Sequence, residues 1–126
     1  MTRLILDSGA FIAFEKGDAG VRSRLAAARR LGIEITTTSP VVGQVWRDGR
    51  RQVLLAGLVS GTLVQAPDVA AARRAGEVLA KSKLEDVVDA LVVGLARDGD
   101  TILTSDPKDI RALLAADGTR ATVVRV

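Results

Sequence analysis

The spacing of apolar residues predicts strands and helices in alternation along the first half of the chain. Residues 4–6 form a short apolar run that is typical of a buried strand, and Gly17 with Asp18 ends the helix that follows it. Apolar residues recur at helical spacing over 21–31, whereas residues 33–38 alternate and are rich in β-branched types. The predicted elements are a strand at 4–6, helices at 10–15 and 21–31, a strand at 33–38, a helix from Pro40 towards Arg47 with Ser39 as its N-cap, a helix from 54 to the stop at Gly61, and a strand at 62–65.

The second half continues the alternation and sets the fold class. Asp68 is placed to cap a helix over 69–81, and a nearly continuous apolar stretch makes the helix over 84–96 a core element. The remaining elements are a strand at 101–104, a helix at 108–116 and a strand at 121–126. Strands that alternate with helices favour a parallel sheet covered on both faces. We therefore expect a three-layer α/β/α fold with a mostly parallel central sheet, in one domain over 1–126.

The composition narrows the chemistry of which this chain is capable. It contains no cysteine, which excludes disulfides, thiol nucleophiles and zinc–thiolate sites. It also contains no histidine, which removes the most frequent general base and transition-metal ligand. Catalysis would therefore depend on carboxylates, lysines, hydroxyls or a hard metal ion bound by oxygen.

Net charge and hydropathy restrict the possible functions less than the absence of cysteine and histidine does. The formal net charge of +3 permits a polyanionic partner without requiring one. The first residues lack the long apolar core of a signal peptide, and no stretch approaches the roughly 20 apolar residues of a membrane span. We expect a soluble, cytoplasmic protein.

Acidic residues gather at the ends of predicted elements. Asp7 directly follows the first predicted strand, and Asp106 closely follows the strand that precedes the last helix. If those strands are parallel neighbours, both carboxylates project from the edge of the sheet at which such folds bind ligands. Glu85, Asp86 and Asp89 fall on one predicted helix, where the two aspartates are three positions apart and share a face.

Each acid alone also has a purely structural interpretation. Asp7 and Asp106 stand where helix N-caps are expected, and Asp86 and Asp89 suit the positive end of a helix dipole. Burying Asp89 beside the apolar run that follows it would, however, be costly unless it is paired or bound to a cation. Together, acids at element ends in a chain without histidine or cysteine suit Mg²⁺ or Mn²⁺, which can activate water against a phosphodiester.

Three segments resemble the motifs of PIN domains, in the same order along the chain. Residues 4–13 (LILDSGAFIA) resemble the opening strand, aspartate and short helix. Residues 86–93 (DVVDALVV) resemble the central Asp-Ala helix, and residues 102–110 (ILTSDPKDI) resemble the strand-then-acid signature. The resemblance spans nearly the whole chain, and the size is similar to that of VapC-type toxins. VapC-type toxins are Mg²⁺-dependent ribonucleases that a cognate antitoxin neutralises, and the resemblance implies the same activity for this chain.

The resemblance assigns roles to the acids. Asp7, Asp89 and Asp106 match three of the family's four acidic positions, and it implies that they bind Mg²⁺ or Mn²⁺ and are catalytic. Asp86 is a further candidate catalytic acid, and Asp109 lies beside the group as an auxiliary. These assignments imply a metal-activated water that attacks an RNA phosphodiester.

One position departs from the family pattern. The fourth acid is usually a glutamate, and Gln44 stands at the matching position. An amide offers a neutral oxygen but adds no negative charge and cannot act as a base, so Asp86 or Glu85 would have to compensate. The chain is therefore either an RNA endonuclease or a catalytically silent PIN-fold domain that binds RNA or protein. A receiver-like signalling domain is a weaker third interpretation, because its lysine and phosphorylatable aspartate have no match.

Basic residues and partners complete the expectations. Arg47, Arg50 and Arg51 fall on a predicted helix near Gln44, where they either contact RNA phosphates or form a solvated face. Trp46 is expected in the core or at a dimer interface rather than as a platform for a base. The resemblance further implies an RNA substrate, a cognate small antitoxin and a homodimer, with no membrane association.

Overall fold

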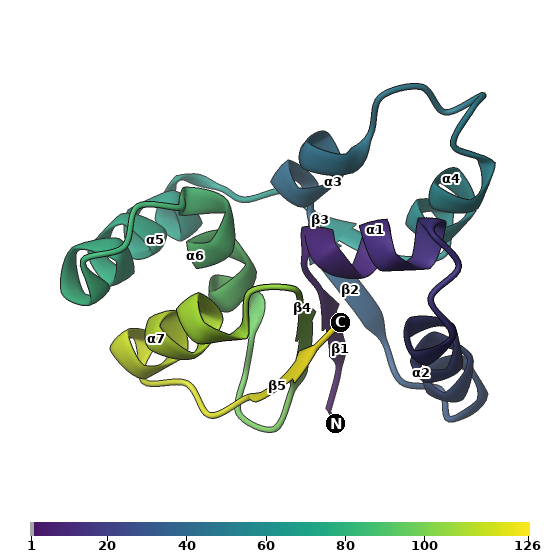
Figure 1. The fold of residues 1–126 in the computed structure, drawn as a ribbon. Helices are drawn as coiled ribbons and strands as arrows, with labels where there is room; N and C mark the ends of the chain where they lie inside the picture. The colour runs from purple at the N-terminus through teal and green to yellow at the C-terminus, as the bar shows by residue number, and fades with distance from the viewer. Residues whose placement is uncertain (1) are drawn as a thin grey trace.

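The structure is a computed structural model that describes residues 2–126. Its elements, labelled in Figure 1, are β1 (Leu4–Leu6), α1 (Ser8–Glu15), α2 (Ala19–Arg30), β2 (Ile35–Thr38), α3 (Ser39–Val45), α4 (Val53–Ser60), β3 (Leu63–Gln65), α5 (Val69–Ser82), α6 (Val87–Leu95), β4 (Thr101–Thr104), α7 (Pro107–Asp117) and β5 (Thr122–Arg125). None of the helices in this described part is long and apolar enough to cross a membrane.

The five strands form one parallel sheet in the order β3-β2-β1-β4-β5. β1 lies at its centre and pairs with β2 on one side and β4 on the other, with Leu6 opposite Leu103. All three residues of β1 are buried, which explains why the sequence shows a continuous apolar run there instead of alternation. The predicted parallel sheet is confirmed, and every pairing in it is parallel.

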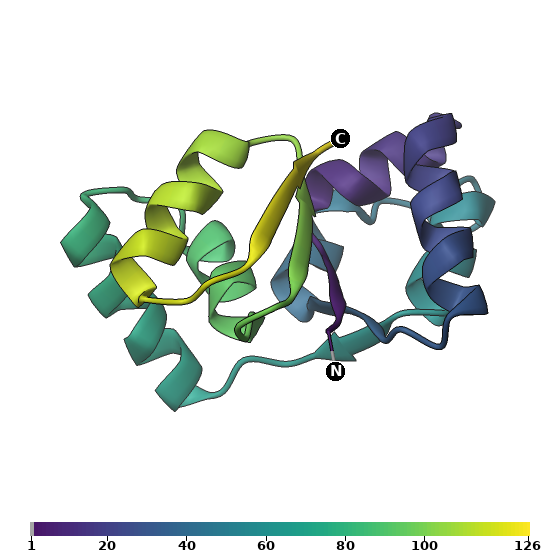
Figure 2. The same cartoon turned by 90° about the horizontal axis from the view of Figure 1, so that it is seen from below.

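Helices cover both faces of the sheet. α5, α6 and α7 pack against one another on one side, whereas α1 contacts α2, α3 and α4 on the other. Figures 1 and 2 show the two groups separated by the strands, so the expected three-layer α/β/α architecture is confirmed. The core between the layers includes Phe11, Ile5, Leu25, Leu103 and Ile110, all at most 1% exposed.

Several predicted boundaries differ from the structure, and at α6 the cause is a polar side chain that satisfies backbone groups locally. α6 begins at Val87, not at residue 84, since Asp86 is its N-cap and accepts hydrogen bonds from the N–H groups of Val88 and Asp89. Glu85 and Asp86 are therefore outside the helix. α3 begins at Ser39 itself, and Thr38 takes the N-cap position while its hydroxyl donates to the carbonyl of Gln65 instead.

The three arginines predicted on a helix lie in the loop between α3 and α4. α3 ends at Val45, and the side chain of Gln52 closes the loop. Its Oε1 accepts from the backbone N–H of Arg47 at 2.7 Å, and its Nε2 donates to the carbonyl of Val45 at 3.0 Å. Arg47, Arg50 and Arg51 are exposed on this loop, and Trp46 beside them is 38% exposed, so it is not in the core.

A buried ion pair ties the amino ends of β1 and β4 together. Arg3 precedes β1, and its backbone N–H and guanidinium both donate to Asp100, each at 2.8 Å. Burial raises the pKa of Asp100, but hydrogen bonds from Arg97 and Arg3 outweigh that effect and hold it below its ordinary value. The register of the two central strands is therefore anchored at the edge of the sheet away from their carboxyl ends.

Candidate metal centre

The carboxyl ends of β1 and β4 place two aspartates at the same edge of the sheet. Asp7 follows β1, and its backbone N–H donates to the carbonyl of Leu103 in β4 at 3.0 Å. Asp106 follows β4 and is the N-cap of α7. Asp7 is only 3% exposed, whereas Asp106 is exposed to solvent. The sequence-based placement of both residues at this edge agrees with the structure.

Thr104, the last residue of β4, connects these two aspartates. Its hydroxyl donates to Oδ2 of Asp7 at 2.7 Å and accepts from the backbone N–H of Asp106 at 3.0 Å. Asp7 Oδ1 meanwhile accepts from the N–H of Ser8 and caps α1. Both oxygens of Asp7 thus have hydrogen-bond donors, and the expected capping role of this residue coexists with its place at the site.

Sequence reasoning missed Thr104. It is completely buried, and a buried hydroxyl requires partners. The sequence offered one signal for this role: a threonine at the end of an apolar strand, two positions before an aspartate.

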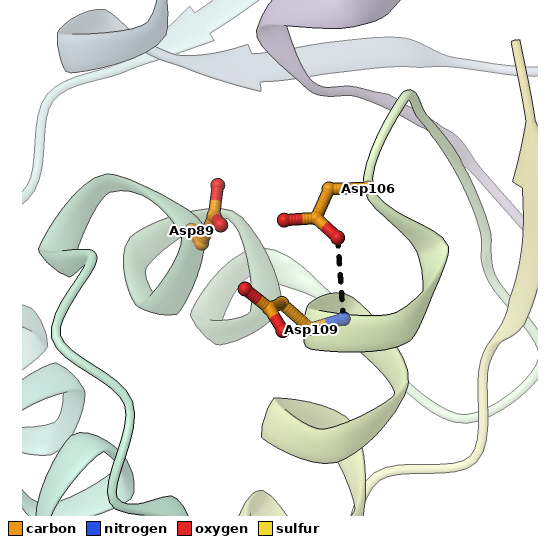
Figure 3. Close-up of side chains that lie close together, drawn as sticks. All are labelled: Asp89, Asp106 and Asp109. Carbon is orange, nitrogen blue, oxygen red and sulfur yellow. Dashed lines mark hydrogen bonds between the residues drawn. The ribbon is translucent and has the colours of Figure 1, made fainter.

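α6 brings a third aspartate to the same edge. Asp89 lies in the first turn of α6, where Asp86 caps its backbone N–H at 3.1 Å. The residue is 9% exposed, and its side chain faces the start of α7 (Figure 3). Among residues 2–126 no group donates a hydrogen bond to the Asp89 carboxylate or forms an ion pair with it. Burial of most of the residue removes water from this carboxylate without supplying a partner, which is costly and identifies the position as functionally unusual.

Asp89, Asp106 and Asp109 converge on one point. Each offers a carboxylate oxygen, and these three oxygens lie within 4.8 Å of one another. Figure 3 shows Asp89 on α6 facing the two aspartates at the start of α7, where the Asp109 N–H donates to Oδ1 of Asp106 at 3.5 Å. Asp7 and Asp86 are outside this trio, although both are near enough for their charges to raise the pKa of Asp89.

Burial and mutual repulsion raise the pKa values at this edge. Burial raises the pKa of Asp89 to about 7, and the charges of Asp7, Asp86, Asp106 and Asp109 contribute in the same direction. Burial raises the pKa of Asp7 too, although the hydrogen bonds from Thr104 and Ser8 oppose the rise. Desolvation also raises the pKa of Asp109, and the charge of Asp106 adds to it, with Lys108 acting in the opposite direction. The carboxyl edge of the sheet therefore carries negative charge that neighbouring positive groups and hydrogen-bond donors do not balance.

The donor set of the trio fits a hard divalent cation. All three donors are carboxylate oxygens, which Mg²⁺ and Mn²⁺ prefer, and no nitrogen or sulfur ligand competes. Oxygens on opposite sides of Mg²⁺ are about 4.2 Å apart, given Mg–O distances of about 2.1 Å. The three oxygens of the trio, all within 4.8 Å of one another, thus lie close to the spacing that one cation requires.

The other predicted site residues lie outside the trio. Gln44 is an exposed residue of α3, and no hydrogen bond involves its side chain within residues 2–126. Arg47 donates to the carbonyls of Gly43 and Trp46, and Arg51 forms an exposed ion pair with Asp48 at 3.8 Å. These residues thus lie on α3 and in the exposed loop after it, and α3 contacts α6, the helix that carries Asp89.

Comparison with known proteins identifies the fold. No protein-family model and no curated protein matches the sequence. A chain in the crystal structure of VapBC2 from Rickettsia felis, bound to a DNA fragment from their promoter, is similar with a TM-score of 0.73 over 99% of both chains, at 11% identity. A chain of DNA-bound VapBC from Salmonella typhimurium is similar with a TM-score of 0.73 over 98% of each chain, at 18% identity. The chain therefore has the α/β fold found in these VapBC structures, and the predicted PIN-like fold is confirmed.

Proposed function

We propose that this protein is an endoribonuclease that depends on Mg²⁺ or Mn²⁺ and acts as the toxin of a VapBC-type toxin–antitoxin module in the cytoplasm. The observation that carries the proposal is the convergence of Asp89, Asp106 and Asp109, with Asp89 buried and without a partner. The shared fold with chains of VapBC complexes supports the same conclusion.

The residues at the carboxyl edge of the sheet would have different roles in such a site. Asp89, Asp106 and Asp109 would hold the cation, and Asp7, which the resemblance also assigns to the metal, follows β1 at the same edge of the sheet. When bound, the cation makes water a stronger acid and offsets the negative charge that develops on a phosphodiester. Asp7 and Asp86 add negative charge next to the trio, which strengthens its attraction for a cation. Thr104 fixes Asp7 relative to the start of α7, so the geometry of the edge is set before the substrate binds.

The loop after α3 supplies candidate contacts for RNA. Arg47, Arg50 and Arg51 are exposed and compatible with phosphate binding, which is independent of sequence. The Arg51 side chain is 89% exposed, and an ion pair as exposed as that with Asp48 contributes little and exchanges readily for a phosphate. We assign substrate binding to these three residues and catalysis to the acids.

Exposed apolar side chains support a protein partner. Ile12 on α1 and Val53 and Leu54 on α4 are 42%, 70% and 49% exposed, and the two helices contact each other. Single exposed apolar residues are ordinary, but several on adjoining elements favour a protein interface. We assign this surface to a small antitoxin and expect a homodimer in addition.

A cleavage assay tests the proposed function. The purified protein is incubated with single-stranded and structured RNA and with Mg²⁺, Mn²⁺ or chelator, beside Asp89→Asn as a matched variant. We expect cleavage that requires the cation and falls at least 100-fold in Asp89→Asn, since that variant removes a charge from the cation site.

The alternative is a silent domain that binds RNA or protein. The neutral and exposed Gln44 favours it, because the chain lacks the acid that its family usually has at this position. Cation-independent RNA binding without cleavage, unchanged in Asp89→Asn, would establish the alternative and exclude the nuclease.

A further inference from the structure

We infer that Trp46 stacks on an unpaired base of the RNA while the neighbouring arginines contact its phosphates. The inference rests on the proposed function and deepens it, because it names single-stranded RNA as the form of substrate that the loop after α3 binds. The sequence alone predicts the core or a dimer interface for Trp46, whereas the residue is 38% exposed.

The loop that carries Trp46 is closed by hydrogen bonds. The Trp46 N–H donates to the carbonyl of Val42 at 2.8 Å, and Nη1 of Arg47 donates to the carbonyl of Trp46 at 2.6 Å. The side chain of Gln52 accepts from the N–H groups of Arg47 and Asp48, at 2.7 Å and 2.9 Å. A backbone held in this way presents the indole without the entropic cost of ordering a mobile loop when a ligand binds.

Gly49 packs directly against the indole of Trp46. A Cβ built on Gly49 would lie 2.6 Å from Cζ2 of the indole and 3.2 Å from its Cη2, so a larger residue there would displace the six-membered ring. The ring is thus supported by the backbone of its own loop, and it still has surface open to solvent. An aromatic side chain that is held in place and partly exposed can accept a stacked base.

The surroundings of Trp46 are complementary in charge to RNA. Residues 46–52 contain three arginines and one aspartate, a net charge of +2, and Trp46 is the only aromatic residue among them. Arg50 and Arg51 are exposed, and the ion pair between Arg51 and Asp48 is long, at 3.8 Å, and open to solvent. Surfaces that bind single-stranded nucleic acid combine such a ring, on which a base stacks, with cationic side chains that follow the phosphates.

The loop lies on the same side of the molecule as the acidic trio. α3 directly follows the carboxyl end of β2, and it contacts α6, the helix that carries Asp89. Figure 1 shows α3 and the loop after it beyond the end of the sheet toward which β1 points. RNA bound at Trp46 and RNA bound at the trio therefore share one side of the protein.

Fluorescence titration of the full-length protein in chelator tests the inference, because Trp46 is the only tryptophan and the chain has no tyrosine. The probes are an oligouridylate of about ten nucleotides and an abasic oligomer of the same length, which keeps the phosphates and lacks the bases. Trp46→Leu removes the ring, Trp46→Phe keeps an aromatic ring, and Gly49→Ala displaces the indole. Gly57→Ala on α4 is the matched control, because a Cβ added there points into open space. Thermal melts by circular dichroism establish that each variant folds.

We expect the oligouridylate, and not the abasic oligomer, to quench the fluorescence of Trp46. The affinity for a labelled oligouridylate, measured by anisotropy, should fall about tenfold in Trp46→Leu and in Gly49→Ala, the loss expected for one stacked base. It should stay near the wild-type value in Trp46→Phe and in Gly57→Ala. The salt dependence of binding should be the same in Trp46→Leu as in the wild type, because that variant loses no phosphate contact.

The results separate this inference from the proposed function. Equal quenching by both oligomers, or equal affinity of the wild type and Trp46→Leu, would mean that no base stacks on Trp46 and would leave the nuclease proposal intact. Fluorescence that changes with protein concentration and not with RNA would place Trp46 between copies of the chain, which also overturns the inference. If the wild type binds neither oligomer, the inference is wrong, and the nuclease proposal is wrong as well only if RNA stays intact with Mg²⁺ or Mn²⁺.

Discussion

The mostly buried residue Asp89 leads to a quantitative prediction for the stability of the protein without metal. Replacement of Asp89 by asparagine keeps the shape of the side chain and removes its charge. Because the pKa of Asp89 is raised from 3.8 to about 7, the charged form is disfavoured in the folded protein. Asp89→Asn should therefore stabilise the metal-free protein at neutral and alkaline pH.

The magnitude and its pH range follow from proton linkage. The folded protein binds the Asp89 proton more tightly than the unfolded chain does, so this contribution to stability is complete below pH 3.8 and is lost as the pH rises to about 7. A pKa displaced from 3.8 to about 7 sets a ceiling of about 4 kcal/mol. Residual solvation lowers the expected gain to about 1–2 kcal/mol, which corresponds to an increase in Tm of about 4–8 °C.

The assay is a series of thermal melts in chelator between pH 4 and pH 8. Wild type and Asp89→Asn should melt at similar temperatures near pH 4 and diverge steadily as the pH rises. Saturating Mn²⁺ should reverse the order at pH 8, because a ligand at 100 times its Kd stabilises the folded wild type by about 2.7 kcal/mol. A difference in Tm that does not change with pH, or a less stable variant at pH 8 in chelator, would refute the reasoning.

Three further predictions concern the same edge of the sheet. Thr104→Val should lower the free energy of unfolding by about 1–3 kcal/mol in urea denaturation, since it leaves Asp7 Oδ2 and the Asp106 N–H without their shared partner, and Thr104→Ser should retain most of that stability. Gln44→Glu should raise Mn²⁺ affinity about tenfold, or about 1.4 kcal/mol, because it adds a negative charge on α3, which contacts the helix that carries Asp89; equal affinity by calorimetry would mean that residue 44 lies outside the site. Mn²⁺ affinity of the wild type should increase as the pH rises to about 7 and then level off, because the cation requires Asp89 to be deprotonated; an affinity that does not change between pH 5 and pH 8 would contradict the role of Asp89.

The sequence by itself determined the elements and the edge at which the acids gather. Apolar runs and helical spacing identify β1, β4 and α7 within one or two residues, because each pattern reflects local burial. Asp7 and Asp106 follow strands, and the alternation of strands with helices requires parallel pairing, so their common edge follows from topology.

Only the tertiary structure decided which groups meet there. Hydrogen-bond partners and distances between oxygens depend on how β1, β4, α6 and α7 pack, and residues separated by 97 positions, such as Asp7 and Thr104, have no local signature of their contact. The same packing brings Asp109 to Asp89 and leaves Gln44 exposed on α3. Side-chain hydrogen bonds also end or shorten predicted helices at Asp86 and at Gln52. Each side chain accepts from backbone N–H groups outside a helix, and the spacing of apolar residues carries no information about such hydrogen bonds.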